Sequence, residues 1–170
     1  MSNEVCRITF KSNLPKLTAE IGQKINQWLE ESSGELESQV KMLSRVDTGQ
    51  TKGSYQHIVD TSKKEARVGS PLQNAIWEEY GTGEYALNGN GRKGWWVYVK
   101  GSNGEYRSNA PKKYYTKEQA LRIMAYLRSK GLEAYATCGK TPNRPIFRAF
   151  SENEAKIIRR LEQVLNEIGT

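Results

Sequence analysis

Arg45-Val46-Asp47-Thr48-Gly49 separates two hydrophobic patterns in this chain of 170 residues. Before this stretch, apolar residues recur every three or four positions, which is the spacing of one face of a helix. After it, short β-branched and aromatic runs alternate with turn sequences, which is typical of strands. We therefore predict that Val46, Asp47, Thr48 and Gly49 form a structural corner that turns a long helix onto a sheet. Asp47 would accept backbone N–H bonds there, and Gly49 would supply an unusual φ.

The residues before this corner predict one long amphipathic helix. From Leu14 onward, apolar positions fall on one face and charged positions on the other, and Pro15 suits the first turn. The run Ser-Ser-Gly at 32–34 is a weak point that could kink or split this helix. An unbroken helix of about thirty residues would span about 45 Å at 1.5 Å per residue. Because this is long for a domain of this size, we expect part of its apolar stripe to meet a neighbouring subunit.

The rest of the pattern predicts an α+β fold. In it, the long N-terminal helix and a C-terminal helix pack on a small antiparallel sheet. The expected strands are 4–10, 54–59, 64–69, 95–99, 105–107 and 132–138. The C-terminal helix follows a turn stiffened by prolines and carries apolar residues at helical spacing from Ile146 to Ile168.

A further helix is expected between the last two strands. Thr116 and Gln119 have the spacing of a capping box, and Gly131 would end the helix near Lys130. Its expected apolar side consists of Ala120, Leu121, Met124, Leu127 and, as a further candidate, Tyr126. The segment 95–138 is therefore predicted to be an inserted strand–helix–strand element.

Composition indicates a soluble single domain, 1–170, with an unusual middle. The apolar fraction is 36%, which is low and suggests that some apolar surface needs a partner. The net charge is +7, and positions 84–141, with eleven Lys or Arg and four Asp or Glu, carry all of this excess. The same basic segment holds nine of the sixteen aromatic residues. Two cysteines, no signal-peptide core and no long apolar run favour synthesis in a reducing cytoplasm, without a membrane span.

Several catalytic interpretations can be weighed against structural ones. Asp47-Thr48-Gly49 also occurs in aspartic proteases, which need a second Asp that a symmetric dimer could supply. Here the motif follows a charged helix and precedes Gln50, so a corner is favoured. A Cys138–His57 pair is a weaker alternative. The glycine loops 81–83 and 89–94 lack a phosphate-binding pattern. We predict no enzyme activity and no catalytic, metal or cofactor site.

The basic segment offers an alternative function, which is sequence-independent binding of a nucleic acid. Aromatic rings can stack on bases while Lys and Arg neutralise phosphates. The alternative structural interpretation is that these aromatic residues form the core of the insertion, with its lysines in solvent. The candidate DNA-contact residues are Arg92, Lys93, Trp95, Trp96, Lys100, Arg107, Lys112 and Lys113.

Three blocks of sequence resemble a known family. They are Val46–Gly49 after the long helix, Trp77–Gly83 after the predicted hairpin, and Pro142–Phe150 at the start of the C-terminal helix. In this order they look like the tail-completion proteins of long-tailed double-stranded DNA phages. These are also called neck, head–tail joining or minor capsid proteins. The resemblance covers about 14–83 and 139–168. It departs at the insertion, where the family commonly has a shorter connection.

The resemblance implies a non-enzymatic virion protein without cofactors. Such a protein forms a homo-oligomeric ring between the head portal or adaptor and the tail tube or terminator, and genomic DNA passes through it. It would be made in the cytoplasm of the host bacterium and reside in the virion neck. The implied assembly loop is Glu79, Tyr80, Gly81, Thr82 and Gly83. The start of the C-terminal helix is marked by Pro142, Pro145, Phe147 and Phe150.

Overall fold

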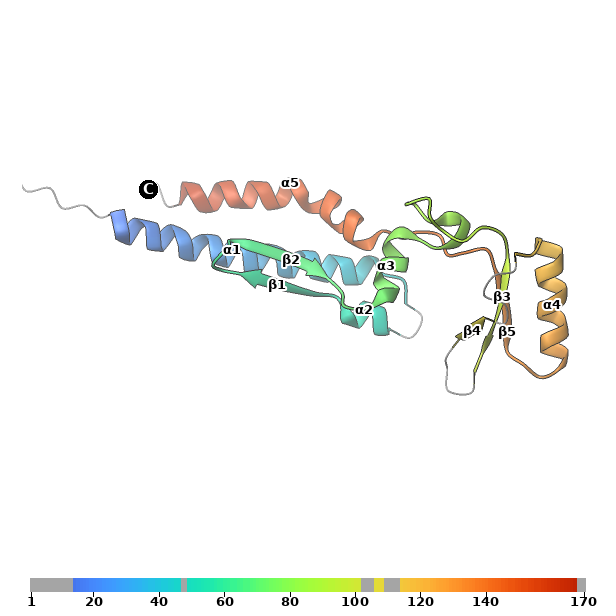
Figure 1. The fold of residues 1–170 in the computed structure, drawn as a ribbon. Coiled ribbons are helices and arrows are strands. Elements are labelled where there is room, and N and C mark those ends of the chain that lie inside the picture. Colours follow the sequence, from blue (N-terminus) through green and yellow to red (C-terminus); the bar gives the residue numbers. More distant parts are fainter. Residues whose placement is uncertain (1–13, 47–48, 102–105, 109–113, 168–170) are drawn as a thin grey trace, which may run out of the picture.

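The structure is a computed structural model that describes residues 14–46, 49–101, 106–108 and 114–167 (Figure 1). Its α+β class agrees with the prediction. The first half contains α1 (Leu14–Leu43), α2 (Gln50–Ser54), β1 (Gln56–Asp60), β2 (Glu65–Gly69) and α3 (Gln73–Tyr80). The second half contains a 3₁₀ turn η1 (Gly83–Tyr85), β3 (Trp96–Lys100), β4 (Tyr106–Ser108), α4 (Lys117–Ser129), β5 (Ala134–Thr137) and α5 (Pro145–Asn166).

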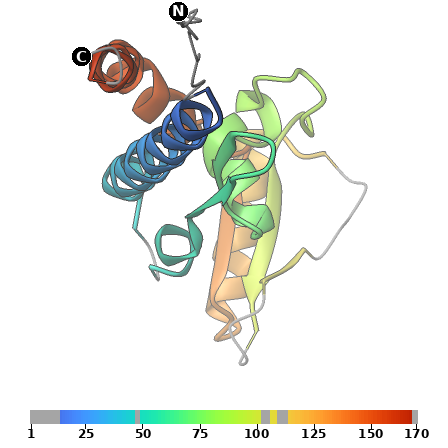
Figure 2. The same ribbon diagram turned by 90° about the vertical axis from the view of Figure 1, so that its left-hand side faces the viewer.

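Helix α1 is the central layer of one half of the molecule. The antiparallel β1–β2 hairpin, paired from Gln56↔Gly69 to Asp60↔Glu65, lies on one side of it, and α5 lies on another (Figures 1 and 2). The C-terminal helix thus packs on α1, which in turn packs on the hairpin. Its core cluster contains Val40, Tyr55, Ala75 and Ala149, with Leu36, Leu43, Val68 and Ile146 packed against it. Much of the apolar stripe of α1 is therefore covered within the chain, and contact with another subunit stays a prediction.

Helix α1 runs without a break through its Ser-Ser-Gly segment. The hydroxyl of Ser33, which is buried, donates to the Leu29 carbonyl oxygen at 2.6 Å. This bond satisfies the buried hydroxyl inside the helix, so the segment does not split it.

The predicted corner is described in part. Gly49 has φ 81, as expected for the left-handed residue of the corner, and Val46 is exposed. Asp47 and Thr48 lie outside the described residues, as does the predicted strand 4–10. The short helix α2 follows, so the prediction of a strand from Ser54 was wrong by two residues. Ser54 ends α2 instead, where its hydroxyl bonds Ser70 at 2.7 Å.

The insertion forms a second unit around a three-stranded antiparallel sheet in the order β4-β3-β5. Helix α4 covers one face and shares a core cluster of Val97, Ala120 and Ala134 with it. The capping box is confirmed: Gln119 N–H donates to Thr116 Oγ1 at 3.3 Å, and Thr116 N–H donates to Gln119 Oε1 at 3.0 Å.

The prediction of the apolar side of α4 was wrong for two residues. Leu121 is 40% exposed and Tyr126 is 62% exposed, while Ile123 packs against the sheet. The face of α4 that meets the sheet is the one that carries Ala120, Ile123, Met124 and Leu127, and Leu121 and Tyr126 lie off this face. The other face of the sheet carries Tyr98 and Tyr135, whose rings stack with centroids 5.3 Å apart.

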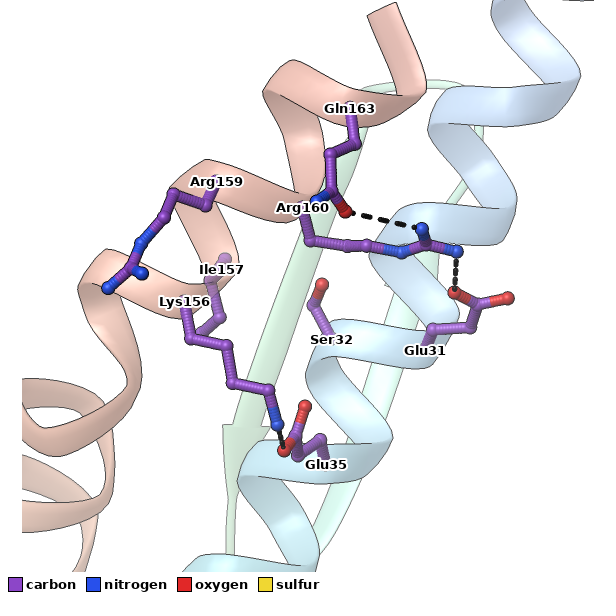
Figure 3. A pocket seen from close by; sticks show the side chains of 8 residues that line it. All are labelled: Glu31, Ser32, Glu35, Lys156, Ile157, Arg159, Arg160 and Gln163. Carbon is purple, nitrogen blue, oxygen red and sulfur yellow. Dashed lines mark hydrogen bonds and ion pairs between the residues drawn. The ribbon is translucent and has the colours of Figure 1, made fainter. Parts of the chain in front are cut away.

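A polar seam lies between α1 and α5 (Figure 3). Lys156 pairs with Glu35, and Arg160 pairs with Glu31 at 3.8 Å while also reaching Gln163. These side chains line a hollow of about 610 Å³. Because Lys156 and Arg160 of α5 are matched there by carboxylates of α1, we interpret the hollow as a helix-packing seam. Exposed pairs of this kind contribute about 0–1 kcal/mol each to stability.

Candidate functional site

Two of the blocks that carry the resemblance, 77–83 and 142–150, meet the end of α1, just before the first block, at a polar joint between α1, α3 and the start of α5. Glu78 is 2% exposed. Its Oε1 accepts the backbone N–H of Arg45 at 3.3 Å, and its Oε2 accepts from Lys140 Nζ. Its carbonyl oxygen accepts the N–H of Asn143 at 2.8 Å, and Asn143 Nδ2 donates to the Leu43 carbonyl at 2.6 Å. One buried glutamate therefore connects residues about a hundred positions apart.

Glu79 caps α5 from a different helix. Its Oε2 accepts the N–H of Ile146 at 2.9 Å, and its Oε1 accepts that of Phe147 at 3.0 Å. The cap residue of α5, Arg144, has φ 57 and provides no side-chain bond of its own. First-turn N–H groups lack partners inside a helix and prefer a negative charge. The carboxylate of Glu79 supplies both the missing hydrogen-bond acceptors and the negative charge.

A close crossing of two backbones completes the joint. The N–H of Thr82 donates to the Lys140 carbonyl at 2.9 Å, and that of Glu84 donates to the Cys138 carbonyl at 2.9 Å. A Cβ built on Gly83 would lie 2.1 Å from the Cys138 carbonyl oxygen, and one on Gly139 would lie 2.0 Å from that of Thr82. Only residues without a side chain allow this approach.

The predicted assembly loop is thus largely engaged inside the chain. Glu79, Gly81 and Gly83 are buried in the joint, whereas the side chain of Tyr80 is 50% exposed. Contact of this loop with a partner stays a prediction.

Of the four residues predicted to mark the start of the C-terminal helix, one is buried, one is half-buried and two are exposed. Pro145 is the first residue of α5 and is fully buried, and Pro142 lies against Gly81. Phe147 and Phe150 are instead 49% and 50% exposed, although both are large and apolar.

A groove of about 1030 Å³ lies beside the joint, between α2–α3 and strand β3. Its aromatic lining residues are Trp77, Tyr80, Trp96 and Tyr98. Its cationic lining residues are Arg45, Lys52, Arg92 and Lys140, while Glu78 is the one carboxylate in the described lining. Glu78 is already paired with Lys140 and lies 4.0 Å from Arg45. With these four cations and one carboxylate, the groove has a net positive charge.

The structure separates the candidate DNA-contact residues. Arg92 and Trp96 lie together in the groove, with the guanidinium 4.9 Å from the ring centroid. Trp95 packs against the core under α4, as the alternative structural interpretation expected. Lys93 is exposed, and Lys100 pairs with Glu133 at 3.7 Å. Lys112, Lys113 and the side chain of Arg107 lie outside the described residues. A role of these residues in DNA contact stays a prediction.

The groove residues that were absent from the predicted set include Arg45, Lys52, Trp77 and Lys140. Arg45 and Lys140 come from distant parts of the chain, and no local pattern connects them. Trp77 could have been found from the sequence, because it is a large aromatic residue in a short predicted segment next to two acidic residues, Glu78 and Glu79. The structure buries these two glutamates and leaves Trp77 exposed.

The alternative Cys138–His57 pair is not formed. His57 Nδ1 lies 2.5 Å from Glu37 Oε2, and its Nε2 lies 3.1 Å from Glu30 Oε1. The thiol of Cys138, in the other half of the molecule, donates to the Tyr85 hydroxyl at 3.6 Å. Both groups are engaged elsewhere, so neither can activate the other.

The cluster around His57 predicts a pH-dependent stability. Hydrogen bonds to Glu37 and then to Glu30 raise the pKa of His57 above 6.5. Bonds from Lys41 and His57 lower the pKa of Glu37 to about 2. A raised histidine pKa stabilises the fold fully below the unfolded value of 6.5, and this contribution is lost as pH rises through the folded value. The contribution of Glu37 is present above 4.5 and lost as pH falls towards 2.

We therefore expect His57→Gln to lower the free energy of unfolding at pH ~5.5 and to have a smaller effect at pH ~9. The loss should not exceed about 1 kcal/mol, because the pair is partly exposed to solvent. Urea unfolding of both proteins at the two pH values measures it. Equal losses at both would contradict the ionic role of His57.

Among the described residues, no group of three or more His, Cys, Asp or Glu side chains could hold a metal ion. No helix in the described part of the chain is both long enough and apolar enough to cross a membrane. No protein-family model, curated protein or solved structure matches this chain. Any functional assignment therefore rests on the sequence blocks and on the geometry of the joint and the groove.

Proposed function

We propose that this protein is a structural subunit of the neck of a tailed phage or prophage, where it forms part of the ring that joins head and tail. The observation that carries this proposal is the joint. Two of the blocks that resemble tail-completion proteins, 77–83 and 142–150, contact each other through Glu78 and Glu79. Arg45, which directly precedes the first block, donates its backbone N–H to Glu78. The residues of these two blocks thus have structural roles together, which supports a shared fold over a coincidence of short motifs.

Exposed apolar side chains support a role in assembly. Trp77, Tyr80, Phe147 and Phe150 are each 45–50% exposed. Large apolar side chains left exposed together, as on α3 and at the start of α5, are characteristic of surfaces that bind other proteins. The proposed partners are further copies of this chain, the adaptor or connector on the head side, and the tail tube or terminator. Genomic DNA would pass transiently through the ring, and the protein would act in the virion without catalysis.

Trans-complementation of a phage that lacks this gene tests the proposal. Without the protein, we expect lysates with filled heads and separate tails and a plaque titre reduced by several orders of magnitude. Expression of the full chain should restore the titre, and a chain truncated before Pro142, which lacks α5, should fail. Lys63→Ala, at a side chain 65% exposed in the hairpin turn, is the matched control and should restore it. Complete infectious virions in the absence of the protein would refute the proposal.

A further inference from the structure

Helix α5 has a second apolar stripe that does not face α1. Ala149 and Val164 are buried on its inner side. On the outer side, Phe147, Phe150, Ile158 and Leu165 remain 49%, 50%, 51% and 46% exposed. At 3.6 residues per turn, these four positions fall within an arc of about 80°. They form an outer stripe along the helix.

The outer stripe carries a cation at its start, where the Arg144 guanidinium lies 3.7 Å from the Phe147 ring centroid, and is negative beyond its first turn. Lys156 and Arg160 point to α1, where Glu35 and Glu31 pair with them (Figure 3). Glu154 falls in the middle of the outer stripe and Glu162 at its margin, both exposed. Neither makes an ion pair with another described residue.

The groove has the complementary character. It offers exposed aromatic rings, and its net charge is positive. Lys52, at its α2 side, makes no ion pair within the described part of the chain. Within one molecule, α5 and α2 lie on opposite sides of α1 (Figures 1 and 2), so the outer stripe of a chain cannot fill its own groove.

We propose that the groove of one copy binds the outer stripe of α5 of a second copy, with Phe150 against Trp77 and Tyr80 and with Glu154 near Lys52 and Arg92. This inference rests on the proposed function, since it names the contact that would build the ring. The two surfaces are different, so the contact is heterologous. Such contacts close into rings when the rotation between subunits permits it.

Cross-linking of mixed single-cysteine variants tests the contact. The full-length background carries Cys6→Ser and Cys138→Ala, and two differently tagged proteins carry Lys52→Cys or Glu154→Cys. A short bismaleimide should give the mixed 52–154 product at least tenfold above the same reaction with Lys63→Cys in place of Lys52→Cys. A predominant 154–154 product would overturn the inference in favour of a symmetric α5–α5 contact.

Charge reversal provides an independent measurement. Glu154→Lys and Lys52→Glu should each weaken self-association at least tenfold in sedimentation equilibrium, and the double variant should recover most of it. Thermal unfolding matching the parent protein shows that each variant is folded. Weakening by both single changes without recovery in the double variant would overturn the pairing.

These experiments distinguish three hypotheses: a contact between copies, a nucleic-acid site in the groove, and the neck function. If a single-stranded oligonucleotide protects Lys52→Cys from maleimide while addition of the second copy does not, the groove is a nucleic-acid site and the inference fails. If the protein restores phage titre but gives no 52–154 product, the inference fails and the neck function stands. If the cross-link forms but the gene is dispensable for virions, the neck function fails and the contact stands.

Discussion

Gly83→Ala should destabilise this protein by at least about 3 kcal/mol, because the new methyl group would overlap two backbone atoms and the position has a left-handed backbone. The Cβ would lie 2.1 Å from the Cys138 carbonyl oxygen and 2.7 Å from Gly139 Cα, and φ is +61. Relief of this overlap must separate the two backbones and break the 2.9 Å bond from Glu84 N–H to Cys138. Urea unfolding of the full chain measures the loss.

Gly89→Ala is the matched control. Its φ is +71, but an added Cβ would have no atom within 4 Å. The substitution therefore isolates the backbone strain, which costs about 1–2 kcal/mol. If both variants lost the same free energy of unfolding, the close approach of 81–83 to 138–140 would be contradicted.

Glu79→Ala should lower the free energy of unfolding by about 2 kcal/mol, because it removes two charge-assisted bonds from the first turn of α5. The N–H groups of Ile146 and Phe147, now bonded at 2.9 and 3.0 Å, would lose their partner in a site where Glu79 is 8% exposed. Amide hydrogen exchange at these two positions should accelerate more than in the middle of α5. This local readout separates loss of the cap from a general loss of stability.

Glu79→Gln tests whether the charge and both acceptors matter. The amide keeps the shape, but its nitrogen cannot accept an N–H, so about half of the loss is expected. Glu152→Ala serves as the control on the same helix, because its carboxylate is 55% exposed and 3.9 Å from Arg148. It should cost less than about 0.5 kcal/mol. A loss as large as that of Glu79→Ala would contradict the capping role.

The joint connects stability with the proposed function. Glu79 holds the start of α5, from which Phe147 and Phe150 project. A variant that frays this turn should therefore also weaken the proposed contact between copies, even though Glu79 itself is buried.

The sequence by itself determined the elements whose signals are local. The 3.6-residue period predicted α1, and the alternating runs on either side of Asp60 predicted the hairpin. The capping box of Thr116 and Gln119 predicted the start of α4. Each depends on residues within a few positions of one another, so the backbone preference is present before any tertiary contact forms.

Tertiary structure alone decided which residues meet. Glu79 caps a helix that begins 66 residues later, and Lys140 and Arg45 share Glu78 across the chain. The same applies to exposure: Phe150 and Ile146 are both large and apolar, but Ile146 packs on the core while Phe150 stays 50% exposed. The hydrophobicity of a side chain predicts that its burial stabilises the protein. The surface that covers it depends on the arrangement of distant elements, and for the outer stripe of α5 we infer that this surface belongs to another copy.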